Sequence, residues 1–575
     1  MEPIPDQPMD QPKQKMKIPC NHMLTYIYLT QSYSYCAVCD GDYGMCYYCP
    51  SCKFHAHSEC IEWPDTIDHP CHSRHPLKKV SPGTIDYTDG KCHFCREELV
   101  DPTYHCSLCN FSVDVNCWRH PPQRTIYQPK SHDHTFTLMP RKITFTCNAC
   151  GMLGDCNPYF CFECAFMLHK DCIDLPRVIN INRHDHRISR TYHLGHGGWD
   201  SCGVCRKEID WMFGAFTCKR CPNYAVHSKC ATREDVWDGK ELEDEPEEEE
   251  EIEDPFKVIN DKEIIHFSHE EHNLRLGDDN VIGYEKMRCD ACITPISCDP
   301  FFKCVQCEFF LHKVCASLPR RKRSIMHTEK LDLQVTNKAG EYNGCRSCNK
   351  LFDGFRYCSR FEKFDVRCGS ISEPFHHELH PHPLYHILSP TGRLKVCGAC
   401  GKYLHYVLSC TVCEFNLGMD CATLPRKVKH RCDDHDLSLH HVHGKPKGQQ
   451  LWCDICEGKI DSSVWFYGCD DCGSTLHINC VLGDFSYLKP GNKYGEAELV
   501  ANDGMTRPFC ICCEKRCRFP SFLKATCPNI VCEQRWGFPS FLKAASSDST
   551  VLFACSMDCA YDKYFMVWFY EDFDY

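Results

Sequence analysis

The sequence lacks a hydrophobic run long enough to cross a membrane. No stretch approaches the roughly 18 apolar residues that a spanning helix needs, and the aromatic run at 565–570 is far too short. Residues 1–17 are rich in Pro, Gln and Lys and contain no apolar segment, so we expect a disordered tail there and not a secretory signal peptide. These absences predict an intracellular protein, in the cytoplasm or nucleus, with no transmembrane segment.

The chain also has little from which to build one large core or long helices. Hydrophobic residues make up 43% of the 575 positions, but that class includes 53 cysteines, and without them roughly a third of the chain is apolar. No segment sustains the 3.6-residue apolar period of a long helix. Small units held together by disulfides or metal are therefore expected. Because intracellular thiols stay reduced, and because 34 histidines serve a metal but not a disulfide framework, we predict zinc sites.

Positive charge is not in excess. The formal net charge is −13, yet residues 241–254 hold eleven acidic and no basic residues, so the remainder carries only −2. Zinc sites rich in thiolate make the protein more acidic still, which argues against strong general affinity for nucleic acid. The acidic linker at 233–262 is interpreted as a flexible, self-repelling spacer, or alternatively as a segment that docks a basic partner.

Internal repeats dominate what is present. The pattern CxxC, four residues, His, two residues, Cys ends at Cys60, Cys172, Cys315 and Cys480, and relaxed versions end at Cys117, Cys230, Cys368 and Cys421. Successive ends lie 53 to 59 residues apart, except for 85 across the acidic tract. Each unit opens with histidines, continues with a first CxxC and an aromatic-rich stretch, and closes with a second CxxC and His-xx-Cys. The short Tyr/Phe/Val-rich stretches favour small β-ribbons.

This arrangement resembles the C1 zinc finger (protein kinase C type, cysteine/histidine-rich), and especially its plant variant, the divergent C1 domain. The resemblance implies a tandem array of small, metal-stabilised, β-rich zinc-finger modules, with little helix and no single large core. The predicted modules 1 to 8 span 18–62, 69–119, 130–174, 182–232, 264–318, 325–370, 378–424 and 428–482, and a C-terminal cysteine-rich zinc unit spans 500–562.

The resemblance also implies two zinc ions per intact module, bound in crossed fashion. One ion, at site A, is held by the opening residues and the second CxxC; the other, at site B, by the first CxxC and the closing His-xx-Cys. Module 6 supports the crossing, because Glu329 replaces an opening His and Phe361 lies where the second CxxC needs its second Cys. Crossed pairing confines both losses to site A, whereas adjacent pairing would damage two sites.

Carried onto this sequence, the pattern gives a ligand set for each site. The site A ligands are Cys20, His22, Cys49, Cys52; His72, His75, Cys106, Cys109; His132, His134, Cys161, Cys164; His184, His186, Cys218, Cys221; His269, His272, Cys304, Cys307; His380, His382, Cys410, Cys413; and His430, His435, Cys469, Cys472. The site B ligands are Cys36, Cys39, His57, Cys60; Cys92, Cys95, Asp114, Cys117; Cys147, Cys150, His169, Cys172; Cys202, Cys205, His227, Cys230; Cys289, Cys292, His312, Cys315; Cys345, Cys348, Asp365, Cys368; Cys397, Cys400, Cys421; and Cys453, Cys456, His477, Cys480.

Modules 2, 7 and 8 also depart from the pattern. Asp114 stands where a closing His belongs, and zinc accepts such an oxygen ligand. Gly418 replaces the closing His of module 7, which leaves a site with three cysteines. This site is either empty or completed by water or by a neighbouring residue. Cys432 competes with His430 and His435 in module 8. In the C-terminal unit we assign Cys510, Cys513, Cys555 and Cys559 to one zinc site, and the repeated phrase at 519–525 and 538–544 to a duplicated loop.

Four protein ligands leave zinc no open position for substrate, so the sequence favours structural zinc and no enzyme activity. We expect a zinc-binding interaction or regulatory scaffold whose partners are other proteins. The resemblance implies a plant protein acting in signal transduction, in stress or hormone responses.

Three other functions are weaker. Thiol–disulfide exchange, as in a protein-disulfide reductase, would use the CxxC pairs, but no βαβ context is visible. Diacylglycerol or phospholipid binding follows from the C1 resemblance, but the modules lack the Gln-Gly pair of lipid-binding members, and the apolar residues 211–213 are interpreted as packing. Residues 320–323 (Arg-Arg-Lys-Arg) are consistent with a nuclear localisation signal, or with a solvated linker between modules.

Overall fold

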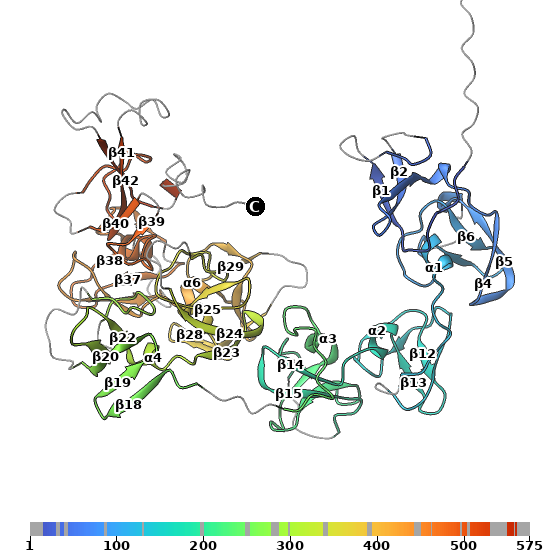
Figure 1. Cartoon of the computed structure of the whole chain (residues 1–575), viewed down its shortest axis with the longest axis horizontal. Coiled ribbons are helices and arrows are strands. Elements are labelled where there is room, and N and C mark those ends of the chain that lie inside the picture. Colours follow the sequence, from blue (N-terminus) through green and yellow to red (C-terminus); the bar gives the residue numbers. More distant parts are fainter. Residues whose placement is uncertain are drawn as a thin grey trace, which may run out of the picture.

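The structure is a computed structural model. It describes residues 15–29, 35–39, 44–84, 89–128, 132–195, 201–247, 253–277, 287–296, 300–336, 343–387, 394–441, 450–461, 463–494, 497–502, 507–528, 549–556 and 558–559. Figure 1 shows a succession of small sheets along the chain, with modules 5 to 8 and the C-terminal unit gathered together. In the described part of the chain, no helix is long and apolar enough to span a bilayer.

Modules 1 to 4 each contain an antiparallel sheet of three or four strands, followed by a single helical turn. Module 1 has β1 (Thr25–Leu29), β2 (Gly44–Cys49), β3 (Phe54–His57) and η1 (Ser58–Cys60); module 2 has β4 (Thr66–His69), β5 (His72–Val80), η2 (Pro82–Thr84), β6 (Thr103–Cys106), β7 (Phe111–Val113) and α1 (Val115–Arg119); module 3 has β8 (Thr125–Ile126), β9 (Phe136–Leu138), β10 (Phe145–Thr146), β11 (Leu153–Gly154), β12 (Tyr159–Cys161), β13 (Phe166–Leu168) and α2 (Lys170–Ile173); module 4 has β14 (Val178–Ile181), β15 (His184–Thr191), β16 (Ala215–Cys218), β17 (Ala225–His227) and α3 (Ser228–Ala231).

Modules 5 to 8 repeat this plan, except that the sheet of module 5 has five strands. Module 5 has β18 (Phe256–Asn260), β19 (Glu263–His266), β20 (His269–Leu276), β21 (Phe301–Cys304), β22 (Phe310–His312) and α4 (Lys313–Ala316); module 6 has β23 (Arg321–Ser324), β24 (His327–Val335), β25 (Phe355–Cys358), β26 (Lys363–Asp365) and α5 (Val366–Gly369); module 7 has β27 (Phe375–His377), β28 (His380–His386), β29 (Lys395–Val396), β30 (Tyr403–Leu404), β31 (Val407–Cys410), β32 (Asn416–Gly418) and α6 (Met419–Ala422); module 8 has β33 (Lys427–Lys429), β34 (Asp436–His440), β35 (Leu451–Trp452), β36 (Lys459–Ile460), β37 (Phe466–Gly468), β38 (Thr475–His477) and α7 (Ile478–Leu482).

The C-terminal unit is a four-stranded antiparallel sheet in the order β39-β40-β41-β42. Its strands are β39 (Lys493–Tyr494), β40 (Ala497–Ala501), β41 (Ser521–Pro528) and β42 (Ser549–Ala554). The repeat copy at 538–544 lies outside the described residues.

The sheets begin earlier than the ligand pattern predicts. Strands β4, β14, β19, β23 and β27 precede the first opening ligand of their modules and form a hairpin with the strand that carries it. The basic run 320–323 is therefore no solvated linker: β23 starts at Arg321, and Lys322 has its pKa lowered by burial. Arg320 lies over the ring of Phe267, 4.0 Å from its centroid.

A buried tyrosine ties several modules to the segment before them. Tyr104, Tyr357 and Tyr467 lie on the strand that leads to the second CxxC, and each is fully buried. Their hydroxyls donate to the carbonyl oxygens of Pro64, Pro319 and Pro425, at 3.1, 3.0 and 2.6 Å. A buried Tyr hydroxyl needs such a partner, so the aromatic stretch between the CxxC pairs also fixes where each module follows the last.

Neighbouring modules dock in pairs through the first CxxC turn. Phe355 of module 6 donates from its backbone N to Ala291 O of module 5 (2.9 Å), and Trp465 of module 8 donates to Ala399 O of module 7 (2.8 Å). In modules 3 and 4, Ser228 Oγ donates to Ala149 O at 2.6 Å. Ala149, Ala291 and Ala399 all directly precede the second cysteine of the first CxxC, so the same turn serves both metal binding and docking.

Apolar burial differs along the array. Module 4 has a separate cluster around Ile179, Ile188 and Phe216, as the expectation of small cores predicts. Modules 5 to 8 share one contiguous cluster, from Ile264 to Tyr487. Their cores are individually small but touch one another, which gathers these four modules into one body.

Candidate metal centres

The first CxxC of each module forms one repeated turn. In modules 2 to 8 the residue after its second cysteine has a positive φ, between 57° and 71°, and its N–H donates to the carbonyl of the first cysteine; these residues are Arg96, Gly151, Arg206, Ile293, Asn349, Gly401 and Glu457. A β-branched residue such as Ile293 rarely adopts this conformation. The turn is therefore imposed by its surroundings, and it aims both sulfurs at the same point.

The closing His-xx-Cys places two further ligands beside that turn. His57, His169, His227, His312 and His477 each precede a single helical turn as its N-cap. Their Cys partner lies three residues on, within the helical turn, so both side chains face one point. The backbone N–H of His312 also donates to Cys289 Sγ at 3.5 Å.

The structure brings the predicted ligands together in the crossed arrangement. Groups whose ligand atoms all lie within 4.8 Å of one another include Cys20, His22, Cys49, Cys52; Cys36, Cys39, His57, Cys60; His72, His75, Cys106, Cys109; His132, His134, Cys161, Cys164; and Cys147, Cys150, His169, Cys172. Eleven more groups of at least three His, Cys, Asp or Glu ligands occur among the described residues.

The later modules show the same crossing in single contacts. At site A, His186 Nδ1 lies 3.4 Å from Cys221 Sγ and His272 Nδ1 lies 3.3 Å from Cys307 Sγ; in module 7 the sulfur of Cys413 lies 3.7 Å from His380 Nε2 and 3.9 Å from His382 Nδ1. At site B, Cys205 with His227, Cys292 with His312, and Cys456 with His477 are 3.3, 3.4 and 3.3 Å apart.

Backbone carbonyls orient the site B histidines of modules 4 and 8. His227 Nε2 lies 3.0 Å from Glu208 O and His477 Nε2 lies 3.2 Å from Lys459 O. Because Nε2 is occupied as a donor, Nδ1 is left as the ligand atom that faces the cysteines.

An aromatic ring that the ligand pattern does not reveal holds the first opening histidine of site A. His72 stacks on Phe111, His269 on Phe309 and His380 on Phe415, with ring centroids 4.6, 4.7 and 4.3 Å apart. Each phenylalanine follows the second CxxC by two residues, and that fixed offset is the signal by which the sequence could have identified it.

Each cluster concentrates negative charge. The sulfurs of Cys147 and Cys150 raise the pKa of His169 to about 10. The Cys480 thiol lowers the pKa of Cys453 to about 4 by hydrogen bonding to its thiolate. Such thiolate-rich sets are suited to a divalent cation.

In modules 2 and 6 an aspartate replaces the closing histidine and uses both of its oxygens. Asp114 Oδ2 accepts from Cys95 Sγ at 2.8 Å, while Oδ1 accepts from Cys117 N at 2.7 Å and caps α1. Asp365 Oδ1 likewise accepts from Cys368 N at 3.1 Å, and its Oδ2 lies 3.4 Å from Cys348 Sγ. One carboxylate oxygen thus takes the place of the imidazole nitrogen.

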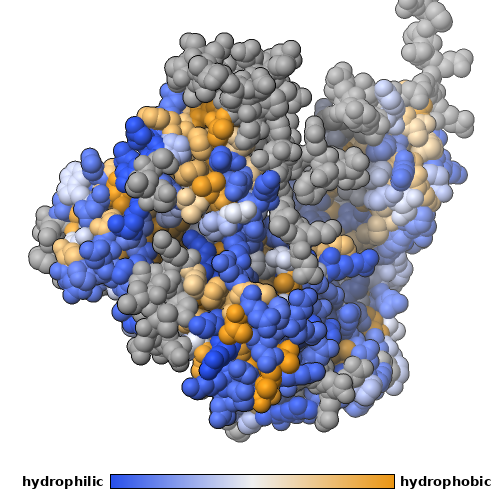
Figure 2. All heavy atoms as spheres, turned by 60° about the vertical axis from the view of Figure 1, so that its left-hand side comes forward, coloured by the Kyte–Doolittle hydropathy of each residue, from blue (hydrophilic) through white to orange (hydrophobic). Residues whose placement is uncertain are grey.

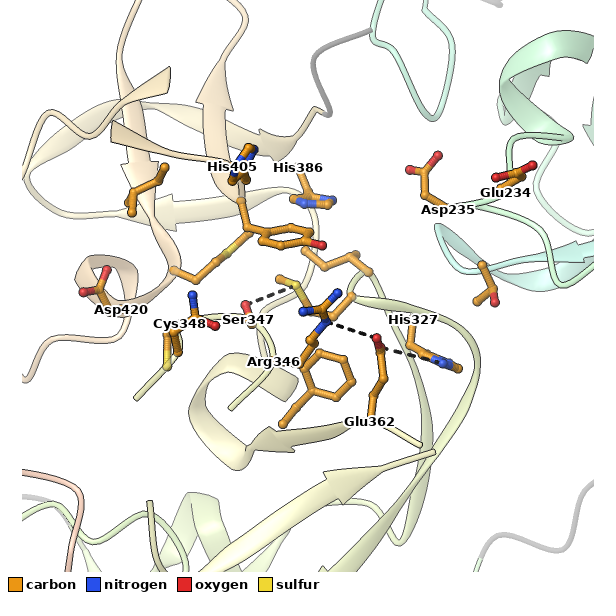
Figure 3. Close-up of a pocket in the computed structure, with 18 of the residues that line it drawn as sticks. Glu234, Asp235, His327, Arg346, Ser347, Cys348, Glu362, His386, His405 and Asp420 are labelled. Carbon is orange, nitrogen blue, oxygen red and sulfur yellow. Dashed lines mark hydrogen bonds and ion pairs between the residues drawn. The ribbon is translucent and has the colours of Figure 1, made fainter. Parts of the chain in front are cut away.

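Site A of module 6 is replaced by ionic contacts. His327 Nε2 lies 3.9 Å from Glu362 Oε2, and Arg346 Nε lies 3.2 Å from Glu362 Oε1. Cys358 donates instead to Asp332 O at 3.6 Å, and Phe361 is 84% exposed. Figure 3 shows the His327–Glu362–Arg346 contacts at the wall of a cavity of about 870 Å³ lined by modules 4, 6 and 7.

Site B of module 7 keeps its backbone but lacks its fourth side chain. Gly418 has the φ and ψ of the other closing positions, −65° and 150°, and its N–H donates to Cys397 Sγ at 3.1 Å. A Cβ at Gly418 would lie 2.5 Å from Leu404 Cδ1 and 3.1 Å from Asp420 Oδ1. Leu404 has filled the space of the missing imidazole, with a carboxylate at its edge.

Site A of module 8 requires a correction. Asp433, and not His430, joins His435 there: Cys472 Sγ lies 3.3 Å from Asp433 Oδ1 and 2.9 Å from His435 Nδ1. The ring of His430 contacts Cys432 Sγ at 2.9 Å instead. Asp433 precedes His435 by two residues, the offset that separates the opening histidines of modules 3, 4 and 7, and that offset identifies it in the sequence.

The C-terminal unit brings five cysteines together. Cys555 Sγ lies 3.6 Å from Cys513 Sγ and 3.7 Å from Cys559 Sγ. The Cys555 thiol lowers the pKa of Cys510 to about 4, and it also lowers that of the buried Cys517. Glu514, after Cys513, has φ 55° and donates to Cys510 O, so this CxxC forms the same turn as in the modules. Sequence reasoning missed Cys517, because it lies outside any CxxC pair.

Comparison with known families matches most of these units. Residues 70–118, 130–173, 182–231, 267–316, 378–422 and 430–481 match the C1 domain, and residues 497–560 match the C1 domain-like, C-terminal family. The matched stretches leave out module 1, which opens with Cys20 and His22 instead of two histidines, and module 6, whose site A is degenerate. No curated protein and no solved structure matches the chain. The matches to the C1 domain alone cover half of the sequence, and the chain belongs to the C1 domain family.

Proposed function

We infer that the chain is a zinc-binding, non-enzymatic interaction scaffold, with two zinc ions in each intact module. The observation that carries this function is the repeated set of four protein donors at one spacing. A tetrahedral zinc ion with Zn–S of about 2.3 Å and Zn–N of about 2.0 Å needs ligand–ligand distances of roughly 3.5–3.8 Å. In site B of module 3, His169 Nδ1 lies 3.5 Å from Cys150 Sγ and 3.7 Å from Cys172 Sγ.

The donor chemistry also fits zinc. Thiolate with imidazole, or with one carboxylate, is the usual zinc set, whereas calcium and magnesium take oxygen ligands. When bound, zinc would supply the cross-link that these small cores lack. Four protein donors leave no position for a substrate, which supports a structural role; site B of module 7 has three cysteines and is the exception.

Apolar residues at the second CxxC turns support a role in binding other proteins. Between or beside these cysteines lie Leu108, Phe162, Val305, Phe361 and Val412, each at least 65% exposed. The face in Figure 2 shows apolar side chains in separate patches among hydrophilic ones. An exposed apolar side chain that recurs at this turn from module to module can make several weak contacts with one partner. Avidity turns such contacts into stable binding. We place the scaffold in signal transduction, in plant stress or hormone responses, on the ground of its family.

Metal stoichiometry tests the proposal. Native mass spectrometry on protein purified under reducing conditions should give about fifteen zinc ions: two in each of the six intact modules, one each in modules 6 and 7, and one in the C-terminal unit. Titration with a chelator should release them together with loss of folded structure and exposure of thiols. A count near half of that, with many reactive thiols in folded protein, would contradict the scaffold and favour thiol redox chemistry.

A further inference from the structure

The described part of the acidic tract is bound to module 4. The carboxylate of Glu241 accepts from the backbone N–H groups of Arg177 and Val178, each at 2.9 Å, and Glu243 Oε1 lies 2.6 Å from Arg177 Nη1. Leu242 is buried and donates from its backbone N to Val178 O at 2.8 Å. Residues 238–247, which we call the acidic strap, are therefore not a free spacer.

Module 4 recognises both the main chain and the charge of the strap. Arg187 donates to the carbonyl oxygens of Glu245 (2.6 Å) and Pro246 (2.8 Å). Arg220 Nη2 lies 3.0 Å from Glu247 Oε2. Carbonyl contacts are specific to a peptide, and arginine–carboxylate pairs select an acidic one.

The strap forms part of the wall of a charged groove of about 1260 Å³ between modules 4 and 6. Its basic lining residues are Arg187, Arg220, Lys240, Arg321, Arg323, Lys330 and Arg360, and its acidic ones are Asp185, Asp238, Glu245, Glu247, Glu329 and Asp332. Asp238, Lys240, Glu245 and Glu247 belong to the strap. Without the strap, six basic residues would face three acidic ones.

The degenerate site of module 6 supplies one wall of this groove. Cys358, Ser359 and Arg360 line it, and they come from the broken second CxxC. Glu329, the other departure from the site A pattern, lines it as well. The turn that carries two candidate metal ligands in other modules here presents the guanidinium of Arg360 to the groove.

We propose that the groove between modules 4 and 6 binds an acidic segment of a partner protein, and that the acidic strap is a built-in competitor that occupies the same surface. This deepens the proposed scaffold function by naming one docking site and the chemistry of its partner. A tethered competitor acts at an effective concentration in the millimolar range, so a partner segment binds fully only when the strap is weakened or displaced.

The test uses the full-length, zinc-loaded chain and a fluorescein-labelled peptide with the sequence of residues 238–247. The triple variant Glu241→Gln, Glu243→Gln, Glu247→Gln weakens the strap without touching a metal ligand. In fluorescence anisotropy it should bind the peptide at least tenfold more tightly than the wild type. The matched control Glu62→Gln, Glu97→Gln, Glu98→Gln removes the same charge from exposed positions of modules 1 and 2, and it should bind as the wild type does.

A second variant keeps the proposal falsifiable. Adding Arg321→Gln and Arg360→Gln to the triple variant removes two basic side chains of module 6, and peptide affinity should fall about tenfold. Equal binding by the triple variant and its control, or no effect of the arginine changes, overturns the proposal. Equally tight binding of a single-stranded RNA of the same charge also overturns it, in favour of a general polyanion site. The zinc count of each variant is measured as well. A low zinc count would contradict the scaffold function, whereas a change in peptide affinity at an unchanged zinc count bears only on the groove.

Discussion

Arg206 of module 4 and Glu373, just before module 7, form an ion pair with 2.6 Å between Nη2 and Oε2, and the glutamate side chain is 5% exposed. The guanidinium of Arg206 also lies 4.1 Å from the ring centroid of Tyr385. Arg183, 1% exposed, donates to His386 Nδ1 at 2.8 Å and to Ile325 O at 2.8 Å. These contacts join the modules before the acidic tract to those after it.

Removing Glu373 should loosen this junction. In Glu373→Gln the largely buried Arg206 loses its counter-charge and the buried Arg183 keeps only Asp235, 4.0 Å away; breaking a buried pair costs about 3–5 kcal/mol. Hydrogen–deuterium exchange should become at least roughly a hundredfold faster in β15 and β28. The matched control is Glu378→Gln, because Glu378 pairs with Arg426 at the surface (2.6 Å, side chains 59% and 74% exposed), and it should cost less than about 1 kcal/mol. Similar exchange in the two variants would contradict the assignment.

The same junction should weaken in mild acid. Burial, together with the nearby charges of Arg183, Arg233 and Lys395, lowers the pKa of His386 to about 3. The undocked imidazole has its ordinary pKa of about 6.5, so the docked state is disfavoured as the pH falls below that value. From pH 6.5 to 5.5 the docking free energy should drop by about 1 kcal/mol.

Measurement of β28 exchange against pH in the wild type and in His386→Gln checks this. Zinc ligands titrate in both proteins, so only the difference reports on His386. Parallel pH profiles would show that His386 has no part in it.

Docking of module 6 on module 5 should depend on Gly354. Its φ is 83°, and a Cβ there would collide with Ala291 O. Gly354→Ala should therefore cost about 1–3 kcal/mol, seen as a lower thermal midpoint and faster exchange at Phe355. Gly344→Ala is the control, because nothing lies within 4 Å of its Cβ position. A variant at Gly354 as stable as this control would refute the close approach.

Loss of one thiol should remove one metal ion only when the thiol lies in a cluster. Cys147→Ser should lower the zinc count by one and destabilise module 3, because its small core relies on the ion. Cys156→Ser, in the same module but outside both ligand sets, should leave the count unchanged. Native mass spectrometry compares the two, and equal counts would argue against site B as drawn.

Site B of module 7 should be repairable. In Gly418→His the imidazole meets Leu404, so this change alone should not add a tightly held ion. The double variant Leu404→Ala, Gly418→His makes room for it, and its chelator titration should show one more slowly released zinc than Leu404→Ala. An unchanged titration would indicate that the three cysteines already have a fourth ligand, with Asp420 as the neighbouring carboxylate.

The ligand chemistry could be predicted from the sequence because it is local. CxxC and His-xx-Cys spacings determine which donors share a turn, and the paired defects at Glu329 and Phe361 indicated the crossing before any geometry. The sequence did not reveal Asp433 as a ligand, because a carboxylate stands where an imidazole is expected. In addition, His430 lies three positions before Asp433 and is itself a residue type that binds metal.

Contacts between modules could not be predicted in this way. No sequence spacing predicts the contact of Arg183 with His386 or of Glu373 with Arg206, since the partners belong to different modules. The charge of the run at 320–323 predicts exposure, as a solvated linker or a localisation signal, whereas Lys322 and Arg320 cover aromatic rings with their long side chains. The acidic tract likewise showed its charge but not its arginine partners.

The apolar cluster shared by modules 5 to 8 makes demetallation there a collective event. Stripping zinc from one of these modules exposes faces that its neighbours also bury, so the remaining ions are held less firmly. Module 4, with its own cluster, should release its metal separately. Chelator resistance should therefore be lost abruptly across modules 5 to 8 and separately in module 4.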